Sequence, residues 1–174
     1  MKLLIFLFLP LFTLSQTCPP QGDNKSLKIQ AADLLKNRSY HPDSANEVSI
    51  DSLMIDHVSD TGYVFVDAYI TSAKISGKES CNCHTTDKGQ LDYHIYISTA
   101  PENTDKKLNQ IVEVSRYSRE LNPSLNFAYV KSLVGHKVRI YGYTFFDGEH
   151  KSGVGKWRSG ILEIHPVFFI ERLD

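Results

Sequence analysis

The sequence lacks an excess of charge of either sign. Its 19 Lys and Arg residues nearly balance 20 Asp and Glu residues, which gives a formal net charge of −1 with His neutral. A nucleic-acid-binding protein normally displays a basic surface that offsets the charge of the phosphates. The net charge therefore does not support a nucleic-acid partner, which would require local clustering of basic residues. Internal repeats are also lacking.

Only one long apolar run occurs, and it lies at the start of the chain. It contains Lys2 as its single charged residue, and the small residues Thr13 and Ser15 precede an expected cleavage site before Gln16. This pattern is typical of a secretory signal peptide, which we assign to residues 1–15. No later stretch approaches the roughly 20 apolar residues that a transmembrane helix needs. We therefore expect a secreted or periplasmic protein with no transmembrane segment after cleavage.

Cysteine is scarce, with residues at positions 18, 81 and 83. Because export permits disulfides, we expect Cys18 to pair with either Cys81 or Cys83 and to leave the other free. A bond between Cys81 and Cys83 would close a very small, strained loop. A structural zinc site at this C-N-C-H stretch, with His84 as a further ligand, is less favoured because it lacks the usual C-x2-C spacing. A lipid anchor on Cys18 is also less favoured, because the two residues before it match a lipid-attachment site poorly.

Residues 16–60 are expected to form an N-terminal arm, one helix and a connector. The helix follows from apolar residues at the spacing i, i+4, i+7 and i+8 after a candidate N-cap at Ser26. These apolar residues are Leu27, Ala31, Leu34 and Leu35. The connector is rich in Pro, Asp, Ser and Asn, and we expect one short helical turn at residues 50–54.

Residues 61–174 have the alternating pattern of β-strands, in which every second side chain points to the same side of a sheet. Five strands are expected, at residues 62–73, 91–98, 111–117, 136–146 and 157–171. Between the third and fourth strands, a helical pattern is bounded by Asn122 as N-cap, Pro123 in the first turn and Gly135 as the end.

Three strands, a helix and two further strands form the element order of the OB-fold. We therefore predict a mainly β protein, with a five-stranded Greek-key OB-fold-like barrel at residues 61–174. It would have a helix between strands 3 and 4 and an additional N-terminal helix. An SH3-like barrel and a helix-capped sandwich are the alternatives, and the position of the helix favours the OB-fold.

Acidic and imidazole side chains occur on the second, third and fifth predicted strands, opposite the aliphatic residues of each strand. They are Asp92, His94, Glu113, Glu163 and His165. In an OB-fold the third strand lies between the second and the fifth, so these side chains would share one patch. Cross-strand neighbours lie about 4.5–5.5 Å apart at Cβ, which is close enough to share a proton or a metal ion.

This patch predicts a site for a divalent metal, zinc or a similar ion, with Asp92, His94 and His165 as ligands. The residues expected to bind a ligand are Asp92, His94, Asp147, His150 and Trp157. The alternative for each of these residues is the ordinary solvated side of an antiparallel strand, where opposite charges stabilise only weakly. The recurrence of D-x-H and E-x-H on strands that the topology brings together favours a site.

Large aromatic side chains also fall on the predicted outer side of the barrel. They are Tyr63, Phe65 and Tyr69 on the first strand and Tyr141, Tyr143 and Phe145 on the fourth. We expect the N-terminal helix and connector to cover these rings. The alternative is an exposed platform for stacking bases or sugars.

The chain resembles an uncharacterised family of exported bacterial proteins. The resemblance is carried by the stretches ESCNC, DYHIYI, IVEVS, LVGHKVRIYGYTFFDGEHK and WRSGILEIHPVFFIE. That family combines an S-C-N-C loop, a D-x-H-I strand and a terminal E-I-H-P-V strand, and the resemblance implies an OB-fold-like domain but no activity. Leu162 departs from the aromatic residue often found before the glutamate.

These observations predict an exported OB-fold-like binding domain whose carboxylate and histidine patch holds a metal or a small ligand. The alternative function is a metal-dependent hydrolase of extracellular polymers, similar to a nuclease or phosphodiesterase. Glu113 or Glu163 would then act as the catalytic base, and Arg158 would neutralise developing charge. A third interpretation is a salt-bridge network that fixes strand register. The sequence leaves open whether the protein is an enzyme.

Overall fold

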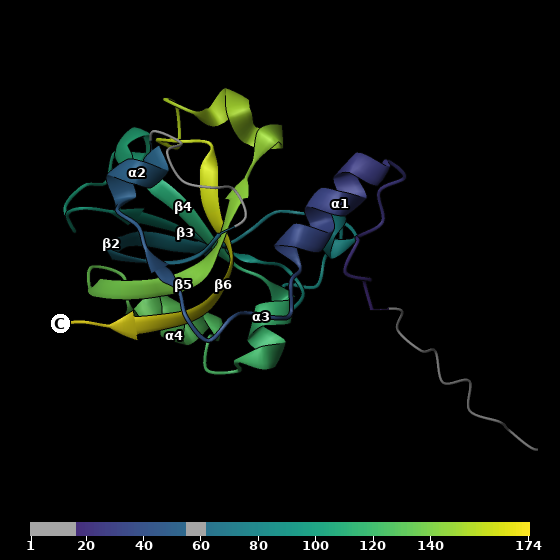
Figure 1. Cartoon of the computed structure of the whole chain (residues 1–174), viewed down its shortest axis with the longest axis horizontal. Coiled ribbons are helices and arrows are strands. Elements are labelled where there is room, and N and C mark those ends of the chain that lie inside the picture. The colour runs from purple at the N-terminus through teal and green to yellow at the C-terminus, as the bar shows by residue number, and fades with distance from the viewer. Residues whose placement is uncertain (1–16, 55–61) are drawn as a thin grey trace, which may run out of the picture.

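The computed structural model describes residues 17–54 and 62–174 (Figure 1). The expected signal peptide at 1–15 lies outside the described residues, as does part of the connector. The helices are α1 (Leu27–Lys36), α2 (Ile50–Met54), α3 (Arg116–Leu121) and α4 (Phe127–Ser132), and the 3-10 turns are η1 (Ser80–Asn82), η2 (Lys106–Leu108) and η3 (Gly148–Gly153). The strands are β1 (Asn46–Glu47), β2 (Tyr63–Ile75), β3 (Tyr93–Ser98), β4 (Gln110–Val114), β5 (Lys137–Phe146) and β6 (Leu162–Arg172). None of the helices described here has both the length and the apolar character to cross a membrane.

Five strands close into a barrel in the order β2-β3-β4-β6-β5, and β5 pairs back onto β2. Strands β4 and β6 run parallel where Val112 faces Ile164, and the other barrel neighbours are antiparallel. The five barrel strands are the five predicted strands, so the prediction of an OB-fold-like barrel is confirmed. Closure pairs the long strands on both sides and leaves no open sheet edge in the barrel.

The barrel interior is aliphatic, as strand alternation predicts. Its fully buried side chains include Val66, Ile95, Val112, Ile140 and Ile164. Leu53 of α2 and Val130 of α4 extend this core from opposite sides of the barrel (Figure 1). Burial of an aliphatic side chain of this size contributes about 1.5–3 kcal/mol, so this side of the strands supplies most of the driving force for folding.

The region between β4 and β5 holds two short helices instead of one. Ser115 caps α3 by accepting a hydrogen bond from the Ser118 backbone N–H, and Asn126 caps α4 by accepting from the Tyr129 N–H. The predicted N-cap at Asn122 is therefore wrong. Because the residue before a proline is disfavoured in helical conformation, α3 ends at this point and α4 begins after a turn.

The last strand begins later than the sequence pattern indicates. β6 starts at Leu162, so Trp157 and Arg158 lie in the preceding loop and do not open the strand. This loop wraps around the Arg158 guanidinium, which is fully buried and donates hydrogen bonds to the carbonyls of Gly160 and Ile161. The Ile161 carbonyl also accepts a hydrogen bond from the Asp147 backbone N–H, so the guanidinium and the end of β5 together fix the loop.

Helix α1 lies beside the barrel next to η1, and it packs through its charged side (Figure 1). Asp33 and Lys36 are buried, whereas Leu27 and Leu34 are 81% and 48% exposed. The predicted apolar side of this helix therefore does not face the protein. Its docking depends on covalent and polar contacts, among them hydrogen bonds from the Asn37 amide to two backbone carbonyls.

A disulfide joins Cys18 to Cys83 and leaves Cys81 as a buried free thiol. The prediction that Cys18 pairs with one residue of the C-N-C stretch is confirmed. The zinc alternative at this stretch is wrong, because Cys83 is consumed by the disulfide. His84 lies on the surface, where it faces Asp23 at 3.6 Å.

The outer aromatic side chains are covered by the segment that follows α1. His41 stacks on Tyr63 with ring centroids 5.6 Å apart, and the Arg38 guanidinium lies over the Tyr143 ring at 4.1 Å. Lys36 lies over the Phe145 ring. The prediction that the N-terminal segment covers these rings is thus confirmed for Tyr63, Tyr143 and Phe145, whereas Phe65, Tyr69 and Tyr141 are half-buried.

Candidate metal centre and adjoining cleft

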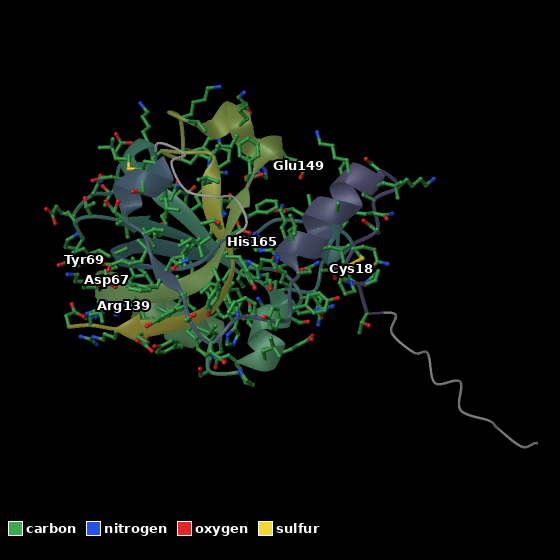
Figure 2. All side chains as sticks on the ribbon, viewed as in Figure 1. Cys18, Asp67, Tyr69, Arg139, Glu149 and His165 are labelled. Carbon is green, nitrogen blue, oxygen red and sulfur yellow. A yellow bond between two sulfur atoms is a disulfide. The ribbon has the colours of Figure 1, made fainter. Side chains whose placement is uncertain are left out.

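The predicted patch forms on the outer side of β3, β4 and β6, where the N-terminal arm covers it. His94 lies directly opposite Glu113 in the antiparallel register of β3 and β4. The parallel pairing of β4 with β6 brings Glu163 and His165 alongside. Figure 2 shows His165 at the centre of the molecule, between the barrel and α1. The sequence prediction that topology unites these side chains is borne out by these contacts.

His165 is the centre of the cluster and is completely buried. Its Nε2 lies 3.7 Å from Asp92 Oδ2, and its Nδ1 lies 3.5 Å from Glu113 Oε2 and 3.7 Å from Glu163 Oε2. These separations exceed hydrogen-bond length, and neither ring nitrogen has a hydrogen-bond partner among the described residues. Buried imidazole nitrogens are normally hydrogen-bonded, so this ring is an exception among the side chains that the structure describes.

His94 approaches the same carboxylate from the opposite side. Its Nδ1 lies 2.7 Å from Glu113 Oε1, and its Nε2 is buried without a hydrogen-bond partner in the described structure. Burial, followed by the charge of Lys74, lowers the pKa of His94 to about 3. The ring is therefore neutral at physiological pH, and its Nε2 can accept or donate one further hydrogen bond, depending on the tautomer.

Burial of several carboxyl groups in one place is energetically unfavourable. Burial raises the pKa of Asp92. Burial, followed by repulsion from Glu163, raises the pKa of Glu113 well above its usual range. Desolvation and like charge both disfavour the ionised form, so the cluster demands either protons or a cation.

Two basic side chains neutralise part of this charge. Arg158 forms ion pairs with Asp147 and, at 2.8 Å, with Glu163, and the three groups are buried together. Asp147 also accepts a hydrogen bond from His150 at 2.8 Å. Burial alone would raise the pKa of Asp147, but its interactions with His150 and Glu163 outweigh burial and lower this pKa. Arg158 is thus held away from the surface by its partners.

The second basic group, Lys36, comes from α1. Its ammonium binds Glu79 at 3.0 Å, and the attraction of this carboxylate raises the pKa of Lys36 although burial opposes the charge. Cys81 lies nearby, with its sulfur 3.9 Å from Asp92 Oδ2. Burial, followed by the charge of Asp92, raises the pKa of this thiol, so Cys81 stays protonated and chemically inert.

Asp92, Glu113 and His165 offer ligand atoms that all lie within 4.8 Å of one another and could hold a metal ion. Two of the three predicted metal ligands, Asp92 and His165, belong to this group, and the third, His94, does not. His94 is hydrogen-bonded to Glu113, the predicted base, which is the third member of the group. The roles predicted for individual residues, including catalysis by Glu113, Glu163 and Arg158, stay predictions.

A cleft of about 460 Å³ opens beside this cluster. Its lining residues are Lys74, Ser76, Gly77, Lys78, Glu79, His94, Tyr96, Lys106, Glu113, His150, Trp157 and Glu163. Of the predicted ligand-binding residues, His94, His150 and Trp157 line this cleft. Asp92 and Asp147 lie behind its wall and do not line it.

The position of Trp157 depends on a glycine of η3. A Cβ atom at Gly153 would lie 2.2 Å from the Trp157 ring, so only glycine permits this close approach. His150 packs against the same ring with centroids 5.6 Å apart. The η3 loop therefore fixes one wall of the cleft.

The sequence prediction missed Lys36, Glu79 and the three lysines of the cleft. Strict alternation would have pointed Lys74 inward like Ile70, and it lies opposite His94 on the outer side only because the register of β2 shifts between Ile70 and Ser72. No sequence signal existed for Lys36 or Glu79 either. They meet only because α1 docks against η1, which is a long-range contact without sequence periodicity.

Comparisons with known proteins give no assignment of this chain. No protein-family model matches it, and no curated protein matches it. A solved structure, that of a candidate aspartyl-tRNA synthetase from Leishmania major Friedlin, is similar over 78% of this chain, with 9% sequence identity and a TM-score of 0.40. The chain spans only 22% of the length of that protein, and likeness at this level supports no conclusion about function.

Proposed function

We infer that this protein is an exported OB-fold-like binding domain that holds a divalent transition metal through Asp92, Glu113 and His165. The single observation that carries this function is the His165 imidazole. It is fully buried, is surrounded by three carboxylates, and has no hydrogen-bond partner on either ring nitrogen among the described residues. A cation bound to one ring nitrogen would satisfy that nitrogen and offset the charge of the carboxylates, and the other nitrogen would donate a hydrogen bond to the carboxylate on its own side.

The charge of the surroundings supports the same function. Five carboxyl groups are gathered around His165, and Lys36 and Arg158 are the basic side chains paired with them. The five carboxyl groups are those of Glu79, Asp92, Glu113, Asp147 and Glu163. A divalent ion would remove most of the remaining negative charge. Protons could do so as well, but they would leave the nitrogens of His165 without hydrogen bonds of normal length.

The donor atoms favour zinc or a similar ion over calcium or magnesium. Calcium and magnesium take oxygen ligands, whereas an imidazole with carboxylates suits zinc and its neighbours. Zinc bonds to nitrogen and oxygen of about 2.0–2.2 Å place tetrahedral ligand atoms about 3.3–3.6 Å apart. Glu113 Oε2 lies 3.5 Å from Nδ1 of His165 and Asp92 Oδ2 lies 3.7 Å from Nε2, so each ring nitrogen has one carboxylate oxygen near this spacing. Ligand atoms of the three residues all lie within 4.8 Å of one another.

The two ring nitrogens of His165 face different carboxylates, which also fits a metal ligand. When one nitrogen of a histidine binds a metal, the other usually donates a hydrogen bond to a carboxylate. Asp92 lies on the Nε2 side, and Glu113 and Glu163 lie on the Nδ1 side. Three protein ligands with a further position for water or ligand are typical of functional zinc sites.

Export of the protein is supported by two observations. The first is the signal-peptide pattern of the sequence, and the second is the Cys18–Cys83 disulfide, since disulfides persist in oxidising compartments. Membership of the exported bacterial family that the motifs resemble is part of this proposal. We place the mature protein outside the cytoplasm on these grounds.

A zinc titration of metal-stripped protein tests the proposal. In competition with a chromogenic chelator, we expect one zinc per chain, and we expect His165→Ala and Glu113→Gln to weaken binding by more than about 100-fold. The matched control is His136→Ala, which changes a histidine that faces Asp174 near the surface. Absence of stoichiometric zinc, or equal affinity of all variants, would contradict the proposed function.

A hydrolytic use of the same site is the second candidate function. The observation in its favour is that Glu113 and His94 line the cleft and are hydrogen-bonded to each other, which is the arrangement of an oriented base. A bound metal would supply Lewis acidity there. Turnover of an activated phosphodiester that is lost in His94→Gln, with zinc binding retained, would distinguish this function from binding alone.

A further inference from the structure

The cleft beside the metal cluster has an unusual distribution of charge. Lys74, Lys78 and Lys106 contribute to its lining from three different segments, namely β2, the loop after it, and η2. None of the three ammonium groups forms an ion pair within the part of the chain that the structure describes. Lys106 contacts the Tyr96 ring, with its nitrogen 5.2 Å from the ring centroid.

Two of the three carboxylates of the cleft, by contrast, already have cationic partners: Glu79 binds Lys36 at 3.0 Å, and Glu163 binds Arg158 at 2.8 Å. Glu113 is hydrogen-bonded at 2.7 Å to the neutral His94, and its charge is the one that the proposed metal would offset. The charge of the three lysines is available to a ligand. A cavity lined in this way attracts anions.

We propose that this cleft binds the phosphate group of a small phosphomonoester, held by Lys74, Lys78 and Lys106. The proposal rests in part on the proposed function, because Glu113 belongs both to the cleft and to the metal cluster. A divalent cation bound by Asp92, Glu113 and His165 reduces the negative charge of the cleft floor. The side chains around the bound phosphate then have a net charge that is neutral or positive.

A phosphate group matches this cleft better than a carboxylate does. A phosphomonoester carries nearly two negative charges and three terminal oxygens, which suits three separate ammonium donors, since lysine binds phosphate as a point charge. The volume of about 460 Å³ falls in the range of small-molecule sites, which favours a compact ligand over a polymer.

The only tryptophan of the chain, Trp157, lines this cleft and reports on its occupancy. The experiment is a titration of the zinc-loaded full-length mature chain, followed by tryptophan fluorescence. The probes are adenosine monophosphate, inorganic phosphate and adenosine. Adenosine absorbs light as the nucleotide does, so it controls for optical effects and for binding of the base alone.

We expect the nucleotide to change the Trp157 emission with saturation and adenosine to have no such effect. The double variant Lys74→Gln with Lys106→Gln is expected to weaken nucleotide binding at least about tenfold, because charged hydrogen bonds are lost. Lys107→Gln is the matched control, since it lies on the same turn as Lys106 but does not line the cleft. Inorganic phosphate that binds as tightly as the nucleotide supports the inference and identifies free phosphate as a sufficient ligand.

Several results would overturn the inference. Adenosine could bind as tightly as the nucleotide, the double variant could bind like Lys107→Gln, or a single-stranded oligonucleotide could bind more tightly than any small probe. The zinc content of the same samples separates this inference from the proposed function. Protein with one zinc and no phosphate binding overturns the inference alone. Metal-free protein that still binds phosphate through the lysines supports the inference and contradicts the proposed function.

Discussion

Ile164 and His165 are neighbours in β6, and both are completely buried, yet they lie on opposite sides of the barrel wall. Ile164 points into the aliphatic core, where it packs with residues such as Ile95 and Val112. His165 points outward into a cluster of carboxylates under the N-terminal arm. The inner side lowers the free energy of the folded state, whereas the outer side raises it unless its charges are compensated.

The comparison teaches that burial has two origins in this protein. The barrel interior is buried because its side chains are apolar. The outer side of β3, β4 and β6 is buried because α1 and η1 are fastened over it by the Cys18–Cys83 disulfide and by polar contacts. The charged cluster under this cover is therefore expected to add less to stability than the aliphatic interior does.

The largest effect on stability is expected for Arg158→Met. This change leaves Asp147 and Glu163 buried without their cation, which typically costs about 3–5 kcal/mol. Chemical denaturation should show this loss in the free energy of unfolding. The control is Arg172→Met, because Arg172 is half exposed and should change stability by less than about 1 kcal/mol. Equal effects of the two variants would show that the outer side is not a tightly paired buried network.

A pair of variants at Ile164 and His165 separates the two sides of the wall. Ile164→Ala creates a core cavity and should lower the free energy of unfolding by about 2–5 kcal/mol with or without zinc. Zinc at 100 times its dissociation constant should stabilise this variant, like the unmodified protein, by about 2.7 kcal/mol. His165→Asn should lose the zinc-dependent stabilisation. Thermal unfolding with and without zinc measures both effects.

The opposite result is that zinc no longer stabilises Ile164→Ala but still stabilises His165→Asn. It would reverse the roles assigned to the two residues. That outcome would contradict the comparison, since it would place the metal-dependent energy on the aliphatic side of the wall.

Removal of the disulfide tests how the outer side is covered. The double variant Cys18→Ser with Cys83→Ser opens a link between residues 65 positions apart, and we expect a loss of about 2–4 kcal/mol. Hydrogen exchange should accelerate in α1 more than in β6, because α1 buries few apolar side chains. Cys81→Ser is the control, since Cys81 is not part of the disulfide. Uniform acceleration over the barrel would argue against a separately fastened arm.

The smallest expected effect concerns His150 at the margin of the cluster. The hydrogen bond to Asp147 raises the pKa of His150 above its usual value of about 6.5. The resulting stability is fully present below that usual value and is lost as the pH rises through the raised pKa. His150→Gln should therefore lose less than about 1 kcal/mol, because the side chain is 44% exposed.

Unfolding at a series of pH values from acidic to alkaline measures this effect of His150→Gln. The difference from the unmodified protein should shrink as the pH rises. A difference that grows with rising pH would have the wrong sign for a histidine stabilised by Asp147.

Most of the barrel could be predicted from the sequence, because strand alternation separates Val64, Val66, Ile95 and Ile97 from the polar residues between them. The helical pattern between the third and fourth predicted strands indicated the OB-fold topology. That topology in turn predicted that His94, Glu113 and His165 lie together. Each of these inferences depends on local patterns or on a fold with few alternatives.

The remaining features depend on contacts that no local pattern encodes. Leu27 and Leu34 gave α1 a misleading apolar side, because this helix is held by a disulfide and by Lys36. Arg158 follows Trp157 in a stretch that seemed to begin the strand, but its buried guanidinium folds the loop instead. The cleft lysines lie on three segments that meet only in the folded barrel.

The central claim is that Asp92, Glu113 and His165 together hold a metal, and X-ray absorption at the zinc edge tests it most directly. The account predicts a first shell of nitrogen and oxygen at about 2.0–2.2 Å, with imidazole scattering that disappears in His165→Asn. A sulfur shell at about 2.3 Å would assign the metal to Cys81 and contradict the account. Protein that retains no zinc after removal of excess metal would contradict it equally.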